Sequence, residues 1–424
     1  MANQHFRLPL ILRQFLGLVI WLIAGVISRP VYAGGLPPEI PETSRAVVAG
    51  ANNCTLITID APTKGLLLIP KDVRSNSDTR YHRAYRSAIH VYVSGKGLPD
   101  GPADGYIERF IVYGTEPAAT PFMVSAAKLL LILWGEAWGH FHRDHPVDTP
   151  VVQVWMDPLK APGLSADVAG EQFKNQIYFY SILTERRPIE WCREIAHEYG
   201  HFSLPGISGY TEPEEWANGV LGERLYTNWL QQDVKAGKVK PTELPIVSPA
   251  DLDEYAAKQI VPVITLIRDG VTREAMRRKD TIGMDTYTGL ALWIDSIYGS
   301  QQLFSAMSYT VPKSAGLLSE GEDFLDGYIQ SIKNTEKQEL TISPLVALPD
   351  RATCTVYLEP GTYRLVARPA TTAWQAQLRS ISIKGTASET ALRVPAAGWY
   401  RLQLHFASPL SEPAAVSIIK SPTQ

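Results

Sequence analysis

The chain has 424 residues, a formal net charge of −3 and three cysteines. So few cysteines exclude a disulfide-stabilised scaffold, and a hydrophobic core has to hold the fold instead. The mildly acidic charge gives no reason to expect nucleic acid or an anionic membrane as a partner, and the length predicts more than one domain.

Residues 1–33 have the pattern of a secretory signal peptide. Two arginines precede an apolar run over residues 15–27, which is short for a membrane span, and Val31 and Ala33 are suitable residues for cleavage before Gly34. Removing this segment removes three arginines and no acid, so the net charge falls from −3 to −6. We expect a secreted or periplasmic protein without stable membrane insertion; an uncleaved N-terminal anchor is the alternative.

Residues 34–118 are expected to form an N-terminal β-rich region. Cys54 begins one strand-like segment, and it could pair with Cys354 if the N- and C-terminal parts meet. Further short strand-like segments alternate with turns rich in Gly, Pro and Asp; they cover residues 66–70, 88–94 and 107–113.

Residues 119–338 are expected to form a mainly helical domain. Its first segment, about residues 121–143, is long and apolar but carries Lys128 and Glu136. We therefore expect a buried core helix rather than a membrane span. Two strand-like runs follow, which predict a small sheet; they cover residues 151–156 and 176–180.

A second helix is predicted for residues 190–201, which contain no proline. His197 and His201 are four residues apart and therefore lie on one helix face, where both imidazoles can bind one cation. Glu198 stands beside the first histidine and can serve as general base for a metal-bound water. This H-E-x-x-H pattern is the signature of zinc peptidases and predicts a Zn²⁺ cofactor. A surface helix with two incidental histidines is the alternative.

The third metal ligand is expected to be an acid. The only histidine after His201 is His405, far downstream, and no aspartate occurs before Asp233. Thr211 is suited to be an N-cap and Pro213 to a first helical turn, so a further helix, antiparallel to the first, is expected to start here. The acids available in this stretch are Glu212, Glu214, Glu215 and Glu223.

The segment His197-Glu-Tyr-Gly-His201, followed by a glutamate on the next helix, resembles the gluzincins, the thermolysin-like and aminopeptidase N-like zinc peptidases. In that family the ligand glutamate is followed three residues later by a small residue and four residues later by a polar one. The family's specific motifs are confined to these two helices. The resemblance implies a Zn²⁺ site with two histidines, one glutamate and an open fourth position.

Glu214 is the third ligand that this resemblance favours. It has Ala217 and Asn218 at the third and fourth following places, and the three would share one helix face. Glu215 is the alternative ligand. A capping-box contact with Thr211 is the other interpretation of Glu214.

Two further roles are implied by the resemblance. In gluzincin catalytic domains an edge strand lies along the cleft and pairs with an extended substrate backbone, and residues 176–180 are expected to have that role; a plain core strand is the alternative. A tyrosine ahead of a downstream helix stabilises the oxyanion, and Tyr287 is the candidate, with a core tyrosine as the alternative. The implied partner is a peptide or protein substrate.

Other histidines, cysteines and acids have structural interpretations. His140, His142 and His145 could form a second metal site, but they stand near a helix C-terminus, and ordinary surface histidines are expected. Cys192 points away from the ligand face and is expected to be a small buried residue. Glu194 is either a group behind the metal ligands or an ordinary acid in the first turns of a helix.

Residues 339–424 are expected to form an antiparallel β-sandwich. Regularly spaced strand-like runs alternate with turns such as Glu359-Pro-Gly. The pattern resembles the small accessory β-domains of secreted peptidases.

The expected fold class is therefore α+β: a gluzincin-like, mainly helical catalytic domain with a small mixed sheet, flanked by the two β-rich parts. The expected function is a secreted zinc-dependent peptidase. The alternative is a catalytically inactive metal-binding, carbohydrate-binding or protein-binding protein on the same scaffold. Glu198 favours the peptidase, because a binding protein has no chemical need for a base beside the metal.

Overall fold

The computed structural model describes most of the chain from Cys54 onwards. The predicted signal peptide lies outside the described residues, and so do His142 and His145. The described residues are 54–71, 76–78, 80–96, 98, 105–115, 120–141, 151–161, 169–310, 319–333, 335–342, 347–348, 351–369, 371–378, 381–386, 391–409 and 413–421. They form both helices and β-sheets, which places the chain in the α+β class.

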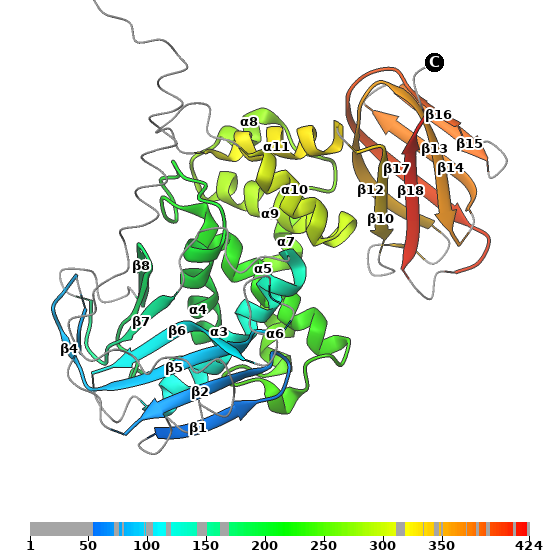
Figure 1. Ribbon diagram of the computed structural model, residues 1–424. Helices are drawn as coiled ribbons and strands as arrows, with labels where there is room; N and C mark the ends of the chain where they lie inside the picture. Colours follow the sequence, from blue (N-terminus) through cyan, green and yellow to red (C-terminus); the bar gives the residue numbers. More distant parts are fainter. Residues whose placement is uncertain are drawn as a thin grey trace, which may run out of the picture. The chain divides into compact units, whose positions relative to one another are not determined.

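A seven-stranded mixed sheet lies in the N-terminal part of the described chain (Figure 1). Strands β6 and β7, and likewise β7 and β9, run parallel, whereas the other neighbouring pairs are antiparallel. The boundary predicted at residue 118 falls inside this one sheet, because β6 pairs directly with β7. In spatial order the strands are β1 (Cys54–Ile59), β2 (Gly65–Pro70), β5 (Ser87–Ser94), β6 (Tyr106–Gly114), β7 (Val152–Met156), β9 (Gln176–Phe179) and β8 (Gly170–Phe173). The short strands β3 (Asn76–Ser77) and β4 (Ala84–Tyr85) pair separately.

The prediction that residues 176–180 form an edge strand is wrong. Strand β9, which covers the predicted segment, lies between β7 and β8, so its backbone is paired on both sides. A tight turn at Lys174 and Asn175 folds β8 back along β9, with Lys174 at a φ of 58°. The last strand in the order is therefore β8, which comes earlier in the chain.

The two faces of this sheet carry different side chains, because successive residues of a strand point to opposite sides. Val112, Val154 and Ile177 belong to the large apolar core on one face, and Tyr113 and Trp155 to an aromatic cluster on the other. Helix α3 (Thr120–Phe141) contributes to the large core and contacts β5 and β6. It is the one described helix long and apolar enough to cross a membrane, but most of its apolar stretch is buried within the fold. This burial agrees with the expected core helix.

Helices α4 (Pro188–Ser203) and α5 (Ala217–Lys235) pack against each other along much of their length. They touch backbone to backbone at Gly200 and Gly222, where a Cβ on Gly200 would lie 2.6 Å from the Cα of Gly222. Any side chain at either position would push the helices apart. This contact fixes the distance between the histidine-bearing helix and its neighbour.

The predicted start of the second helix is wrong. Helix α5 begins at Ala217, with Trp216 as the N-cap, rather than at Thr211. Both the backbone N–H and the hydroxyl of Thr211 donate to the carbonyl oxygen of Lys279, so Thr211 is bound to another segment and does not cap α5. Glu214 consequently lies in the connecting loop, not on the helix.

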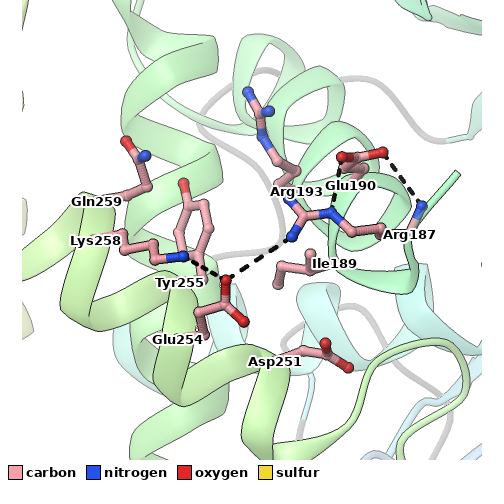
Figure 2. A pocket seen from close by; sticks show the side chains of 9 residues that line it. All are labelled: Arg187, Ile189, Glu190, Arg193, Asp251, Glu254, Tyr255, Lys258 and Gln259. Carbon is pink, nitrogen blue, oxygen red and sulfur yellow. Dashed lines mark hydrogen bonds and ion pairs between the residues drawn. The ribbon is translucent and has the colours of Figure 1, made fainter.

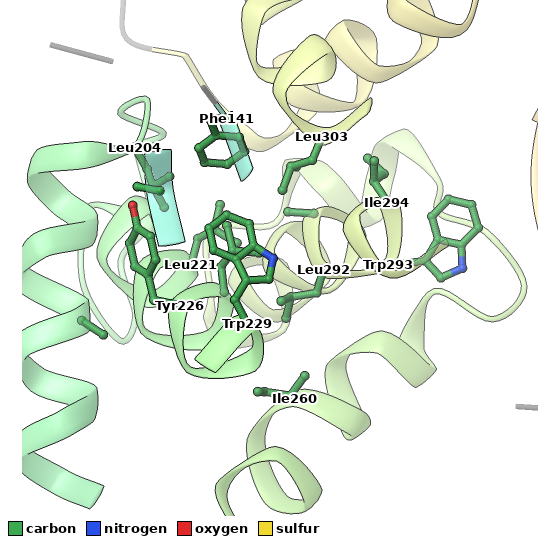
Figure 3. Packing of buried hydrophobic residues seen from close by; sticks show 14 of the residues in the cluster. Phe141, Leu204, Leu221, Tyr226, Trp229, Ile260, Leu292, Trp293, Ile294 and Leu303 are labelled. Carbon is green, nitrogen blue, oxygen red and sulfur yellow. The ribbon is translucent and has the colours of Figure 1, made fainter. Parts of the chain in front are cut away.

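The remaining helices surround α5 and α9. Tyr226 and Trp229 of α5 belong to the same apolar core as Leu292 of α9 (Figure 3), and the indole N–H of Trp229 donates to Asp295 at 2.8 Å. The helices are α6 (Pro249–Tyr255), a π-helical turn η4 (Ala256–Ile260), α7 (Val261–Leu266), α8 (Arg273–Arg277), α9 (Thr281–Tyr298), α10 (Ser300–Tyr309) and α11 (Gly321–Lys333), with a 3₁₀ turn η3 at Pro241–Glu243.

The C-terminal strands form two sheets in which every paired strand is antiparallel. One sheet has the order β10 (Lys337–Ile342), β18 (Ala414–Lys420), β13 (Gly361–Arg368), β16 (Ala391–Val394). The other has the order β11 (Ala347–Leu348), β12 (Arg351–Leu358), β17 (Gly398–Phe406), β14 (Thr371–Leu378), β15 (Ile381–Thr386). Cys354 on β12 and Cys54 on β1 belong to different sheets, and no disulfide joins them.

Candidate metal centre

Three side chains converge between α4 and the loop before α5. The Nε2 atoms of His197 and His201 are 3.1 Å apart, and Oε2 of Glu214 lies 3.2 Å from the first and 3.5 Å from the second. The two imidazoles stand edge to face, with ring centroids 4.8 Å apart. These three residues form a group that could hold a metal ion.

The separations of the three donor atoms suit a tetrahedral metal ion. Zinc binds imidazole nitrogen and carboxylate oxygen at about 2.0–2.2 Å. Donors on a tetrahedron of that radius are about 3.3–3.6 Å apart, close to the separations of 3.1, 3.2 and 3.5 Å. Three acceptor atoms at these distances repel one another unless protons or a cation lie between them. The geometry therefore fits a divalent ion with three protein ligands.

The second nitrogen of each imidazole is bound from α5. Nδ1 of His201 lies 3.2 Å from Oδ1 of Asn218, whose amide group donates to the backbone oxygen of His201 at 3.0 Å. Nδ1 of His197 lies 3.4 Å from Oε2 of Glu223. When each Nδ1 carries the hydrogen and donates it, both Nε2 atoms keep a lone pair for a metal.

Glu223 is itself held by two residues outside the metal centre. The guanidinium of Arg193 donates to its carboxylate at 3.0 and 3.3 Å, and the hydroxyl of Tyr255 donates to Oε1. Burial alone would raise the pKa of Glu223, but the contacts with His197 and Arg193 lower it to about 2. Glu223 was only one of four candidate acids in the sequence; its place beside His197 was not predicted.

Glu198 is a buried carboxylate beside the three converging side chains. It is 3% exposed, and its Oε2 atom has no hydrogen-bond partner among the described residues. Burial raises its pKa well above the usual value, and the charges of Glu194 and Glu214 add to this, against the opposing effect of His197. Oε1 of Glu214 is a second buried oxygen without a described partner. These two buried carboxylate oxygens can accept hydrogen bonds from, or bind, a group at the centre.

Gly219 makes room for the tips of both imidazoles. A Cβ at this position would lie 2.3 Å from Nε2 of His201 and 2.6 Å from Nε2 of His197. The backbone of α5 therefore approaches the centre more closely than any other residue type would permit. The place of Gly219 at the site was not predicted from the sequence.

The loop that carries Glu214 is tied at both of its ends. The N–H of Ala217 donates to the carbonyl oxygen of Ile207 at 2.8 Å, and the N–H of Tyr210 donates to that of Glu215 at 3.3 Å. Glu214 is half-buried beside the histidines, whereas the neighbouring Glu215 is exposed. Of the two alternatives left by the sequence, the structure places Glu214 at the centre.

Tyr287 lies in the helical core on α9. It is 1% exposed and packs edge to face on Phe324, with ring centroids 5.1 Å apart. Burial raises its pKa well above the usual value, and the nearby Tyr210 adds to this. None of its described contacts is with the two histidines, Glu198 or Glu214. Its place corresponds to the core tyrosine that was the alternative interpretation.

His140 and Cys192, which were also singled out in the sequence, do not contribute to the metal centre. His140 is not an ordinary surface histidine, because its ring stacks on Trp229 with centroids 3.9 Å apart and its Nδ1 is 3.1 Å from the hydroxyl of Ser300. Cys192 is buried on α4, as expected for a small core residue.

A pocket lies between α4 and the segment that runs from α6 into η4 (Figure 2). Arg193 and Tyr255, which both bind Glu223, form part of its wall. The three converging residues and Glu198 do not line it. Its rim is held by ion pairs of Glu254 with Lys258 at 2.6 Å and with Arg187 at 3.8 Å.

No protein-family model matches this chain, and no curated protein matches it either. The class of protein is therefore defined by the site itself: a candidate metal centre of two histidines and one glutamate beside a buried, unpaired carboxylate.

Proposed function

We propose that this chain is a secreted zinc-dependent peptidase of the gluzincin type. The observation that carries the proposal is the convergence of three donor atoms from His197, His201 and Glu214 at tetrahedral spacing, with the unpaired carboxylate of Glu198 beside them. A purely structural metal site needs no such carboxylate, and it is commonly closed by a fourth protein ligand.

The chemistry of the proposed reaction assigns one role to each group. His197, His201 and Glu214 would hold Zn²⁺, which when bound polarises the substrate carbonyl and lowers the pKa of a water. Glu198 would accept a proton from the attacking water as the new C–O bond forms, and then deliver it to the leaving amine as the C–N bond breaks. Glu223 and Asn218 would keep the imidazoles in the required tautomer.

The proposed function also gives each part of the chain a role. The helices and the seven-stranded sheet would form the gluzincin-like catalytic part, centred on residues 119–338. The two C-terminal sheets, residues 339–424, would form an accessory β-sandwich. Residues 1–33 would direct export and be removed. The substrate would be a peptide or protein bound in an extended conformation along β8, the strand nearest to Glu198.

The proposal is tested by measuring the zinc content and the peptide hydrolysis of wild type and variants. Purified protein should contain about one zinc ion per chain, as for a three-ligand site, and His197→Ala with His201→Ala should remove it. Glu198→Gln keeps the shape and the metal but cannot accept the proton, so hydrolysis of extended peptides should fall at least about 10²-fold. Equal inactivity of zinc-loaded wild type and Glu198→Gln across a broad peptide panel would overturn the peptidase and favour a binding protein.

A further inference from the structure

Glu194 is a second carboxylate beside the catalytic candidate Glu198. It lies one helical turn earlier on α4, and both residues face Gly170 on β8. The Cβ position that Gly170 leaves vacant is 2.9 Å from Oε1 of Glu198 and 3.0 Å from Oε1 of Glu194. The two carboxylates are therefore neighbours, and they lie where β8 passes the metal centre.

Three other acids around the centre, Glu214, Glu223 and Glu171, have partners. Glu214 faces the two histidines, and Glu223 accepts from Arg193 and Tyr255. The remaining acid, Glu171 of β8, is bound by Arg80 at 2.9 Å and by the hydroxyls of Tyr81 and Tyr180.

Glu194 differs from these acids. Among the described residues it makes no hydrogen bond and no ion pair. The two arginines near it are engaged elsewhere: Arg193 binds Glu223, and the guanidinium of Arg186 lies over the ring of Trp191 at 5.1 Å. Burial raises the pKa of Glu194 more than His197 and Arg193 lower it. An added cation would therefore stabilise its charged form.

We infer that Glu194 is a specificity-determining residue that binds a positively charged group of the substrate beside the scissile bond. This inference rests on the proposed peptidase function. Two observations carry it: Glu194 lies beside Glu198 at Gly170 and has no described hydrogen bond or ion pair, and Glu198 is only 3% exposed with an unpaired oxygen.

The positive group has two possible sources in a peptide. One is the α-ammonium of a free N-terminus, which would make the enzyme remove terminal residues. The other is a lysine or arginine side chain within the peptide. The chemistry is the same for both, because a half-buried carboxylate gains a charge-assisted hydrogen bond from either group.

Matched peptides separate these sources. Each peptide is prepared with lysine or with its uncharged analogue norleucine at successive positions, and with a free or an acetylated N-terminus. Wild type should prefer one charged form by about tenfold in kcat/KM, the size of a partly desolvated ion pair. In Glu194→Gln this ratio should fall to about one, with the loss mainly in KM. Glu194→Asp, which keeps the charge, should retain part of the preference.

Glu190→Gln is the matched control. Glu190 lies one turn earlier on the same helix, but it is paired with Arg187 at 3.0 Å and does not face Gly170. This variant should keep the wild-type ratio. Zinc content should be the same in all the variants, because no ligand is changed. A wild type without charge preference, or an undiminished preference in Glu194→Gln, would overturn the assignment.

Binding measurements separate this inference from the proposed function. Calorimetry with zinc-loaded Glu198→Gln protein measures affinity for the same peptides without cleavage. Charge-selective binding that disappears in Glu194→Gln with Glu198→Gln supports the role of Glu194, even if the wild type cleaves nothing. In that case the peptidase proposal alone would fall. Equal affinity for charged and uncharged peptides would reject the role of Glu194.

Discussion

Glu223 lies 3.4 Å from Nδ1 of His197, on the side of the imidazole opposite Glu214. This places a carboxylate from the middle of α5 behind a histidine of α4. A partner of this kind fixes the tautomer of a ligand and increases its basicity. Arg193 and Tyr255 hold the carboxylate in place, so the support for the metal centre extends across three helices.

Replacing Glu223 should therefore weaken metal binding without removing a ligand. Glu223→Gln loses the charge that faces His197, and we expect zinc affinity to fall about 10–100-fold, as is usual for such partners. Competition with a chromophoric chelator measures this directly. Lys258→Gln, which changes only the rim of the adjacent pocket, should leave zinc affinity unchanged. An unaltered affinity in Glu223→Gln would mean that Asn218 and the ligands suffice to orient the imidazoles.

Replacement of Glu214 and of its neighbour Glu215 should affect zinc retention very differently. Glu214→Ala removes a carboxylate oxygen that lies 3.2 Å from Nε2 of His197, so zinc should be lost on dialysis if Glu214 is a ligand. Glu215→Ala changes an exposed side chain and should retain zinc. Elemental analysis after dialysis against a weak chelator compares the two. The reverse order would make Glu215 the ligand.

The sequence predicted the histidine-bearing helix well, because a four-residue spacing fixes two side chains on one helix face whatever surrounds them. It misplaced the loop that carries Glu214, because Thr211 is bound by the carbonyl oxygen of Lys279, 68 residues away. A local capping pattern cannot reveal such a contact.

The order of the strands in the sheet could not be predicted from the sequence either. Strand-like runs indicate where strands occur, but residues 170–173 gave no such signal, and only pairing in space makes β8 the last strand. The close approach of Gly219 to the two imidazoles could not be predicted either, because it depends on which side chains lie opposite this glycine in space. The sequence therefore predicted the two candidate ligands on one helix, but not the groups that position them.

Gly219 provides a steric test of the centre. In Gly219→Ala the new methyl group would lie 2.3 Å from Nε2 of His201, so both imidazole tips would have to move. We expect zinc affinity to fall at least about tenfold while the helix persists, because alanine favours helix. Gly139→Ala is the control, since its Cβ would meet no atom within 4 Å. Zinc titration and circular dichroism measure both variants. Full zinc affinity in Gly219→Ala would show that the metal binds elsewhere.

Asp295 makes stability depend on pH at a distance from the metal centre. Burial raises its pKa from 3.8 to about 6, against the opposing effects of Trp229 and His140. The folded state therefore binds a proton more tightly than the unfolded state, so this group lowers the free energy of unfolding as the pH rises from about 4 to about 6. The lost stability is about 3 kcal/mol for a shift of this size.

Asp295→Asn should remove this loss, because an amide stays neutral and its oxygen can still accept from the indole of Trp229. We expect the variant to be more stable than wild type at pH 7 and to lose that advantage as the pH falls below the unfolded pKa of 3.8, where Asp295 in the wild type becomes protonated in both states. Urea unfolding at a series of pH values, with metal-free protein, measures the difference. Asp253→Asn is the matched control, because Asp253 is an exposed acid and should show no gain at pH 7. A gain in Asp295→Asn that is independent of pH would show that the effect comes from packing and not from the buried charge.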